Sequence, residues 1–190
     1  MKIVAIDFET ANRNPLSACA LGLAIFEDHE LVESPYWLIK PPKGHGWFIE
    51  EWTQDIHGIG WFDVCQKPEF GVIAQEVVTH LTAADLVVAH NARFDLRVLH
   101  ALLDHFHIPA PSFQHQCTLE LSRHTWPDLP NQQLSTLAAH IGHTFQHHHA
   151  QSDAEAAGRV LHALMRDLGV QSVAELSAKI NLEAYFLLPQ

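Results

Sequence analysis

The sequence has no long apolar run, no cluster of basic residues and no paired cysteines. No stretch approaches the roughly 18 apolar residues of a membrane-spanning helix, so we expect no membrane partner. Lys and Arg total 11 against 22 Asp and Glu, which gives a formal net charge of −11. The cations are scattered along the chain, and this argues against broad electrostatic binding to duplex DNA.

The cysteines and the N-terminus indicate the cellular compartment in which the protein is expected to lie. Cys19, Cys65 and Cys117 are odd in number, lie far apart and form no Cys-x-x-Cys pair. They predict free thiols in a reducing environment rather than disulfides or structural zinc. The apolar part of the opening "MKIVAIDFET" is too short for a secretory signal, so we expect a cytoplasmic protein.

What the sequence does contain is enough apolar material for one core. Apolar residues make up 47% of the 190 positions, which fits a single domain. We expect that domain over residues 1–170. Residues 171–190 are too few for a second domain and are predicted to be a short helical extension of the first.

Hydrophobic periodicity predicts alternating strands and helices. Nearly continuous apolar runs at 2–8 and 85–90 are typical of strands buried on both faces. Residues 19–40 read as a hairpin, and residues 41–60, rich in Pro and Gly, as irregular. A further short strand is expected at 113–118, and helices at 70–81, 91–106, 119–125, 134–140, 152–168 and 172–180. This order predicts a mixed α/β domain.

Two acids end the first predicted strand. Asp7 and Glu9 are two residues apart, so their side chains share one face of the strand. They would project together from its C-terminal end, where α/β sheets commonly place ligands. The alternative is an ordinary strand end running into solvent.

Two further acids begin the apolar stripes of helices. Asp95 precedes apolar residues at four, seven, eight and eleven positions further on, and Asp153 does the same. Each acid therefore points inward, where a carboxylate is costly unless it is paired or bound to metal. The alternatives are a favourable helix dipole for Asp95 and a capping role for Asp153 beside Ser152.

Four carboxylates that meet in one partly buried place would repel one another, and divalent cations would offset the repulsion. Ligands that are all oxygen suit Mg²⁺ or Mn²⁺. Two such ions held by carboxylates are the arrangement that clamps the attacking and leaving oxygens in phosphodiester cleavage.

Three segments carry a family resemblance. "DFET" (7–10), "AHNARFD" (89–95) and "HHAQSD" (148–153) resemble, in order and spacing, the three motifs of the DEDDh 3′–5′ exonucleases. The intervening "IHGI" (56–59) and "LPNQQLSTLAAHIG" (129–142) are similar too, and the resemblance covers about residues 1–168. It implies a ribonuclease H-like fold, with a five-stranded mixed sheet and helices on both faces.

The resemblance also implies residue roles. Asp7, Glu9 and Asp153 would bind one Mg²⁺ or Mn²⁺ ion, and Asp7 with Asp95 would hold a second. His148, five residues before the last acid, would be the general base, since an imidazole with an ordinary pKa near 6.5 suits proton transfer at neutral pH. The residues that match positions touching the terminal nucleotide in relatives are Thr10, His57, Asn91 and Phe94.

Some of these assignments have alternatives. Phe94 could equally belong to the core, because Val98 follows one helical turn later. Gly60 departs from relatives, many of which carry a hydroxyl residue at that position. In a chain with 16 histidines, His147–His149 could also be a solvated cluster or an adventitious site for transition metals. Local sequence alone allows either His148 or His149 to face the acids.

The function expected from this resemblance is a metal-dependent 3′–5′ exonuclease. It would release nucleoside 5′-monophosphates from the 3′ ends of single-stranded DNA or RNA. One alternative is a hydrolase of short oligonucleotides, which need few phosphate contacts. Another is a proofreading-type subunit acting mainly through a polymerase partner. Relatives occur as monomers and as dimers, so a homodimer is also compatible with the sequence.

Overall fold

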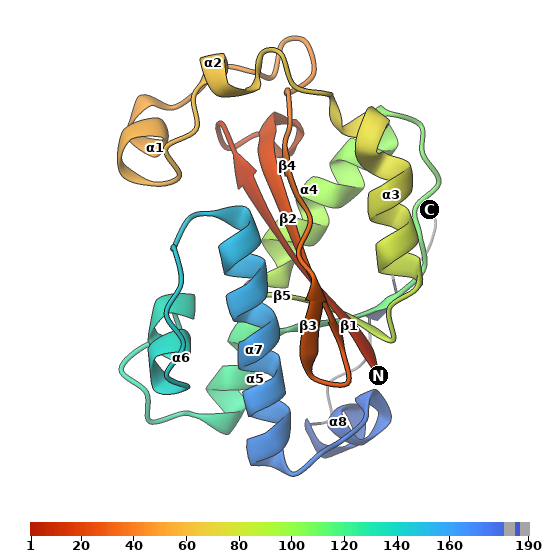
Figure 1. Ribbon diagram of the computed structural model, residues 1–190, viewed down its shortest axis with the longest axis vertical. Helices are drawn as coiled ribbons and strands as arrows, with labels where there is room; N and C mark the ends of the chain where they lie inside the picture. Colours follow the sequence, from red (N-terminus) through yellow and green to blue (C-terminus); the bar gives the residue numbers. More distant parts are fainter. Residues whose placement is uncertain (181–184, 187–190) are drawn as a thin grey trace.

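The first strand lies at the centre of the sheet. In the computed structural model, which describes residues 1–180 and 185–186, β1 (Lys2–Thr10) pairs antiparallel with β2 (Ala18–Glu27) and parallel with β5 (Leu86–Ala89). The sheet has the order β3-β2-β1-β5-β6-β7, and β4 also pairs with β2 (Figure 1). The remaining strands are β3 (Glu30–Glu33), β4 (Tyr36–Leu38), β6 (Gln114–Cys117) and β7 (Tyr185–Phe186).

The predicted mixed sheet is confirmed, with two more strands in the described residues than the five expected. One addition is β7, which pairs with β6. The other arises because the outer strand of the hairpin is divided at Ser34 and Pro35 into β3 and β4. Proline has no N–H to give to a ladder, so it interrupts regular pairing at a sheet edge. Both short pieces pair with β2, one near each end.

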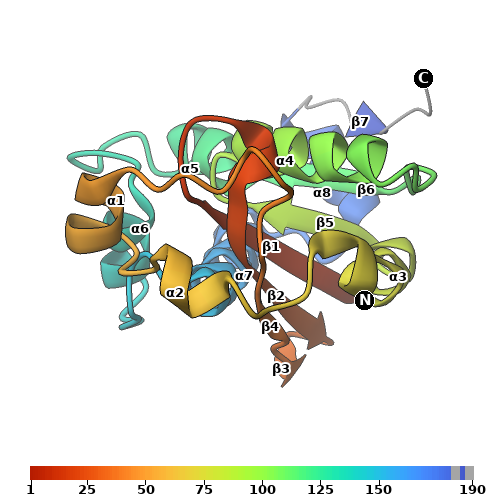
Figure 2. The ribbon, with the colours of Figure 1, turned by 90° about the horizontal axis from the view of Figure 1, so that it is seen from above.

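Helices cover both faces of the sheet, as expected. A 3₁₀ turn at Pro15–Ser17 precedes them. The α-helices in the described residues are α1 (Glu50–Asp55), α2 (Trp61–Val64), α3 (Phe70–Thr82), α4 (Ala92–His105), α5 (Thr118–Thr125), α6 (Leu134–His140), α7 (Ala150–Leu168) and α8 (Val173–Ile180). One core lies between the sheet and α3 and α4, and a second lies under α7, α5 and α6. In Figure 2, β1 runs between α4 and α7.

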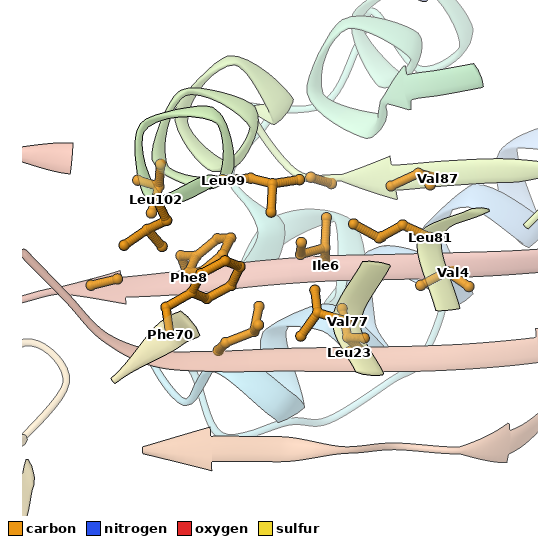
Figure 3. Packing of buried hydrophobic residues seen from close by; sticks show 14 of the residues in the cluster. Val4, Ile6, Phe8, Leu23, Phe70, Val77, Leu81, Val87, Leu99 and Leu102 are labelled. Carbon is orange, nitrogen blue, oxygen red and sulfur yellow. The ribbon is translucent and has the colours of Figure 1, made fainter. Parts of the chain in front are cut away.

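The alternation along β1 assigns its side chains to these two cores. Val4, Ile6 and Phe8 pack against α3 and α4, as Figure 3 shows, whereas Ile3 and Ala5 face the α7 side. A strand repeats every two residues, so Asp7 and Glu9 continue the series of Ile3 and Ala5. The two acids therefore project toward α7.

Several details differ from the sequence expectations. The region 41–60, expected to be irregular, contains the short helix α1, and α7 begins two residues before the predicted residue 152. Asn91 precedes α4 as expected of an N-cap. However, its backbone is left-handed (φ 65°) and its side chain makes no capping hydrogen bond. Helix α8 lies within the helix predicted at 172–180, whereas Tyr185–Phe186, in the segment 171–190 expected to be helical, form the strand β7. Residues 181–184 and 187–190 of that segment lie outside the described residues. Across the described chain, no helix is both long and apolar enough to span a membrane.

Helix α7 lies very close to β2 at two glycines. A Cβ on Gly22 would overlap the backbone of Ala150 and Gln151, where α7 begins, and a Cβ on Gly158 would overlap the ring of Phe26. The absent side chain at Gly22 lets the start of the helix lie directly on the sheet. This contact sets the position of the first turn of α7, which carries Asp153.

We predict that Gly22→Ala destabilises the protein, because the added methyl group meets backbone atoms that cannot rotate away. Overpacking of this kind costs about 1–3 kcal/mol of unfolding free energy, and rigid backbone neighbours favour the upper end. Urea denaturation would measure the loss. The control is Gly60→Ala, where the nearest atom, Cγ2 of Thr53, lies at 3.4 Å. Equal stability of the two variants would contradict the prediction.

Candidate active site

Three carboxylates converge at the C-terminal end of β1. Asp7 and Glu9 project from the strand toward α7, and Asp153 lies in the first turn of that helix. Ligand oxygen atoms of these three residues all lie within 4.8 Å of one another, and the group could hold a metal ion. The strand and the helix thus bring together three of the four acids singled out from the sequence.

The fourth acid reaches the strand from the opposite face. Asp95 lies in the first turn of α4 and is 1% exposed. Its Oδ1 accepts a hydrogen bond from the backbone N–H of Phe8 at 3.0 Å, between the two acids of β1 in sequence. Its Oδ2 is buried and has no hydrogen-bond partner. The helix dipole alone does not account for a carboxylate oxygen left without a partner in the interior.

Asp153 has the same kind of environment. It is 4% exposed, and its Oδ1 lies 2.9 Å from Nδ1 of His147, while its Oδ2 is buried without a partner. The capping alternative is not observed, because the N-cap residue of α7 is His149. Ser152 instead accepts a hydrogen bond from the backbone N–H of Gln146.

Burial raises the pKa of all four carboxyls, and repulsion between carboxylates adds to this for Asp7, Glu9 and Asp95. For Asp7, burial is the largest cause of the raised pKa, followed by the negative charges of Asp95, Asp153 and Glu9. Burial, and then the charge of Asp153, raises the pKa of Glu9 to about 8. Burial also raises the pKa of Asp95 and of Asp153, against the hydrogen bonds from Phe8 and His147 respectively. The raised pKa values mean that the ionised form of each carboxyl is disfavoured in the absence of a cation.

The donor set fits hard divalent cations. It consists of carboxylate oxygens, two of which are buried and unpartnered, and such oxygens are the ligands that Mg²⁺ and Mn²⁺ prefer. A bound cation would also favour the ionised carboxylates over their protonated forms.

The three consecutive histidines have three different surroundings. His147 contacts Asp153, as described, and its ring stacks on that of His148 with centroids 3.9 Å apart. His149 stacks on Tyr36 at 4.6 Å. Among the described residues, the cluster whose ligand atoms lie close enough together to hold a metal ion is Asp7, Glu9 and Asp153, and it includes none of these histidines. They therefore do not act as one metal-binding tract in this conformation.

His148 faces the carboxylate cleft, with His147 beside it. Its backbone is left-handed (φ 61°), which is uncommon for a residue other than glycine and directs its side chain differently from those of its neighbours. Burial, and then the positive charge of His147, lowers the pKa of His148, against the charge of Asp153. A lowered pKa keeps the imidazole neutral near pH 7, as a proton acceptor must be.

Asp7, Glu9, Asp153 and His148 line a cleft of about 830 Å³, whereas Asp95 does not line it. Of the four residues expected to touch a terminal nucleotide, Asn91 and Phe94 line this cleft, and Phe94 also packs against the α3–α4 core. Thr10 and His57 do not line it. Thr10 is 5% exposed on β1, and Nδ1 of His57 accepts a hydrogen bond from the backbone N–H of Ile59. His57 nevertheless lies near enough for the charge of His148 to lower its pKa, after burial as the main cause.

One wall of the cleft consists of residues that the sequence did not single out. They come from the start of α4, from α5 and from the loop into α6: His90, Leu119, Arg123, Gln132, Gln133, Leu134 and Ser135. His90 lies 3.0 Å from Oγ1 of Thr118, and burial lowers its pKa to about 4. His90 lies within the segment 89–95, and the wall residues from 132 to 135 lie within 129–142, two segments that carry the family resemblance. Leu119 and Arg123, on α5, lie in none of the segments that carry it.

Comparison with known proteins identifies the family. A family model described as exonuclease, RNase_T, matches residues 4–161. The chain belongs to this exonuclease family. This confirms the resemblance drawn from the three sequence motifs.

The curated relatives of this exonuclease-family chain include DNA polymerase III of the PolC type. The chain is 28% identical to the Streptococcus mutans protein over 184 residues, covering 93% of this chain and 12% of the relative. It is 36% identical to the Streptococcus suis protein over 167 residues, covering 86% and 11%. The chain thus spans about a tenth of the length of these relatives.

Solved structures show the same fold. Exonuclease X in complex with 5′ overhanging duplex DNA aligns with a TM-score of 0.68 at 24% identity, covering 90% of this chain and 95% of that one. The nuclease domain of 3′hExo, a DEDDh family member bound to rAMP, aligns with a TM-score of 0.70 at 12% identity, covering 100% and 97%.

We predict that Glu9→Gln stabilises the metal-free protein, and more so at high pH. The pKa of Glu9 is raised in the folded state from its ordinary 4.5 to about 8, so the folded state binds this proton more tightly than the unfolded state. The resulting stability is complete below pH 4.5 and is lost as the pH rises through 8. The gain in Tm from Glu9→Gln should therefore increase between these pH values in the presence of a chelator.

Thermal denaturation over this pH range would measure the effect. Glu51→Gln, at an exposed position of α1, is the matched control and should leave the pH dependence of Tm unchanged. A gain in Tm from Glu9→Gln that does not vary with pH would count against the repulsion described above.

Proposed function

We propose that this chain is a metal-dependent 3′–5′ exonuclease that hydrolyses the terminal phosphodiester of single-stranded nucleic acid and releases nucleoside 5′-monophosphates. The observation that carries the proposal is the pair of buried, unpartnered oxygens, Oδ2 of Asp95 and Oδ2 of Asp153. Asp153 shares one cleft with Asp7, Glu9 and His148, a histidine of lowered pKa, and Asp95 contacts the backbone of Phe8, between the two acids of β1.

The ligands proposed for the first ion are supported by this geometry, and those proposed for the second ion follow from the family resemblance. Asp7, Glu9 and Asp153 would hold one Mg²⁺ or Mn²⁺ ion, because their oxygens already lie within 4.8 Å of one another. Asp7 and Asp95 would hold a second ion. When bound, two such ions supply positive charge and Lewis acidity at the phosphodiester.

The residues of the chain would then perform the proton transfer and the positioning. A neutral imidazole nitrogen of His148 accepts a proton from the attacking water. The water oxygen forms a bond to phosphorus, and the bond from phosphorus to the 3′ oxygen breaks. The leaving oxygen takes a proton and becomes the new 3′ hydroxyl. His147 positions Asp153 through the 2.9 Å contact between Nδ1 and Oδ1. Asn91 and Phe94, in the cleft wall, would contact the terminal nucleotide, and stacking on Phe94 suits any base.

Thr10 and His57 are proposed to support the same nucleotide from the other side of β1. Thr10 follows Glu9 directly on the strand, and the pKa of His57 responds to the charge of His148. Their contribution to substrate contact would require a small movement toward the cleft, since neither lines it.

A second candidate is a proofreading role beside a polymerase. The observation that favours it is the match to PolC-type DNA polymerases. The chain matches about a tenth of the length of these polymerases. In that case the chain would act on mismatched 3′ ends delivered by a polymerase. Hydrolysis of free oligonucleotides would then be slow, and adding the polymerase would accelerate it.

We predict that activity depends strictly on a divalent cation. A single-stranded oligonucleotide labelled at its 5′ end should shorten one nucleotide at a time with Mg²⁺ or Mn²⁺. It should remain intact with a chelator. Asp153→Asn should reduce the rate by at least about a hundredfold, since removing one group that stabilises charge in a reaction commonly costs that much. A gel that resolves product length would decide, and internal cleavage or activity in chelator would contradict the proposal.

We predict that the three histidines contribute unequally. His148→Ala should abolish most activity, by about a hundredfold or more, because general-base catalysis contributes 10²–10⁴-fold. His149→Ala should retain activity, since its ring lies against Tyr36 and outside the cleft. His147→Ala should give an intermediate loss through Asp153. Steady-state rates on one labelled oligonucleotide would test this, and equal losses at 148 and 149 would refute the assignment.

A further inference from the structure

The cleft has one strongly basic position. Arg123, on α5, is the sole Lys or Arg among the described residues that line it. The same cleft is also lined by Asp7, Glu9 and Asp153. In a chain with a net charge of −11, a cation at this place is not explained by the general composition of the surface.

Arg123 has no acidic partner within the described part of the chain. No ion pair there includes it, although Glu120 lies three residues earlier on the same helix. Its side chain is exposed, and its positive charge is one of the causes, after burial, that lower the pKa of His90 in the same wall. An exposed guanidinium that lines a cleft and has no carboxylate partner is available for a phosphate group.

The position of Arg123 is beside the carboxylates and not among them. Helix α5 directly follows β6, and the strand order β1-β5-β6 separates β6 from the acids of β1 by two strand spacings. Neighbouring strands lie about 4.8 Å apart, so α5 begins about 10 Å from the strand that holds the reacting phosphate. Arg123 therefore suits a phosphate other than the scissile one.

The other side of β1 disfavours phosphate. The segment 44–66 contains no Lys or Arg, and its helix α1 carries Glu50, Glu51 and Asp55. This segment is held to the chain just after β1, where Nδ2 of Asn12 donates to the carbonyl of Trp47 at 2.7 Å. Figures 1 and 2 show α1 apart from α5. A polyanionic strand leaving the acids is thus repelled on the α1 side.

We propose that Arg123 forms a subsite for the phosphodiester adjacent to the scissile one, so that the substrate strand leaves the acids along the wall of α5 and α6. The inference rests on the proposed exonuclease function. The inference assigns to the chain a second contact with a substrate phosphate. It also assigns the direction in which the nucleic acid strand leaves the acids. Gln133 and Ser135, polar residues of the same wall, would border the path.

A matched pair of dinucleotides tests the subsite. The thymidine dinucleotide with a free 5′ hydroxyl offers the scissile phosphate alone, and its 5′-phosphorylated form adds the neighbouring phosphate. The wild-type protein should prefer the phosphorylated form, by kcat/KM, about tenfold, the value of a good charge-assisted contact. Arg123→Ala should reduce this ratio to near one, mainly through KM, and Arg123→Lys should retain part of it.

The control is Arg159→Ala, an exposed arginine of α7 that does not line the cleft, which should leave the ratio unchanged. If Arg123→Ala lowers kcat/KM for both dinucleotides equally, or leaves the ratio intact, the subsite is refuted.

A binding measurement separates the subsite from the proposed function. Competition of the two dinucleotides against a fluorescent single strand, with Ca²⁺ in place of Mg²⁺, needs no turnover. The same preference should appear and should be lost in Arg123→Ala. The slope of log affinity for the longer strand against log salt should also fall by about 0.7 for the one lost phosphate contact. Absence of hydrolysis with the preference present would reject the nuclease proposal alone, whereas absence of the preference would reject the subsite.

Discussion

Electrostatic repulsion among four carboxylates at the end of β1 is the constraint on which the site depends. Asp7 and Glu9 project to one side of the strand, Asp153 meets them from α7, and Asp95 reaches the strand from the face of α4. Burial raises the pKa of every member, and the charges of neighbouring carboxylates add to this for Asp7, Glu9 and Asp95. Such a group of carboxylates lowers the stability of the folded state. It persists because the two hydrophobic cores on either side of the sheet hold its members in place.

Much of this arrangement could be predicted from sequence because it follows from periodicity. The two-residue repeat of a strand places Asp7 and Glu9 on one face, and the apolar stripes of α4 and α7 place Asp95 and Asp153 inward. The helices from α3 onward and most strands were predicted close to their bounds for the same reason, whereas α1 and α2 were not predicted. These features depend on local repeats, which a single sequence displays directly.

The features that could not be predicted from the sequence depend on contacts between segments that are remote along the chain. Arg123 and His90 meet in one wall because α5 and α4 follow neighbouring strands, and no local pattern marks Arg123 as a cleft residue. The left-handed backbone of Asn91, which removes its side chain from a capping role, is likewise set by the surrounding fold. The choice between His148 and His149 depended on the exact start of α7, which sequence fixes only to within a few residues.

The three adjacent histidines, His147–His149, make different contacts. The positive φ of His148 turns its ring into the cleft, while His149 lies against Tyr36 and His147 takes Oδ1 of Asp153. The bond to Oδ1 leaves Oδ2 of Asp153 as the unpartnered oxygen. The histidine next to the proposed base therefore helps determine which carboxylate oxygen is available to a cation.

The division of the outer strand at Pro35 has a consequence for behaviour in solution. Free sheet edges can recruit strands from other molecules and begin aggregation. On the β2 side, the edge consists of two short pieces, of four and three residues, separated by a residue that lacks a backbone donor. The first piece also carries Glu30 and Glu33. The same break that raised the strand count thus leaves an edge that is poorly suited to templating growth of the sheet by a second copy of the chain.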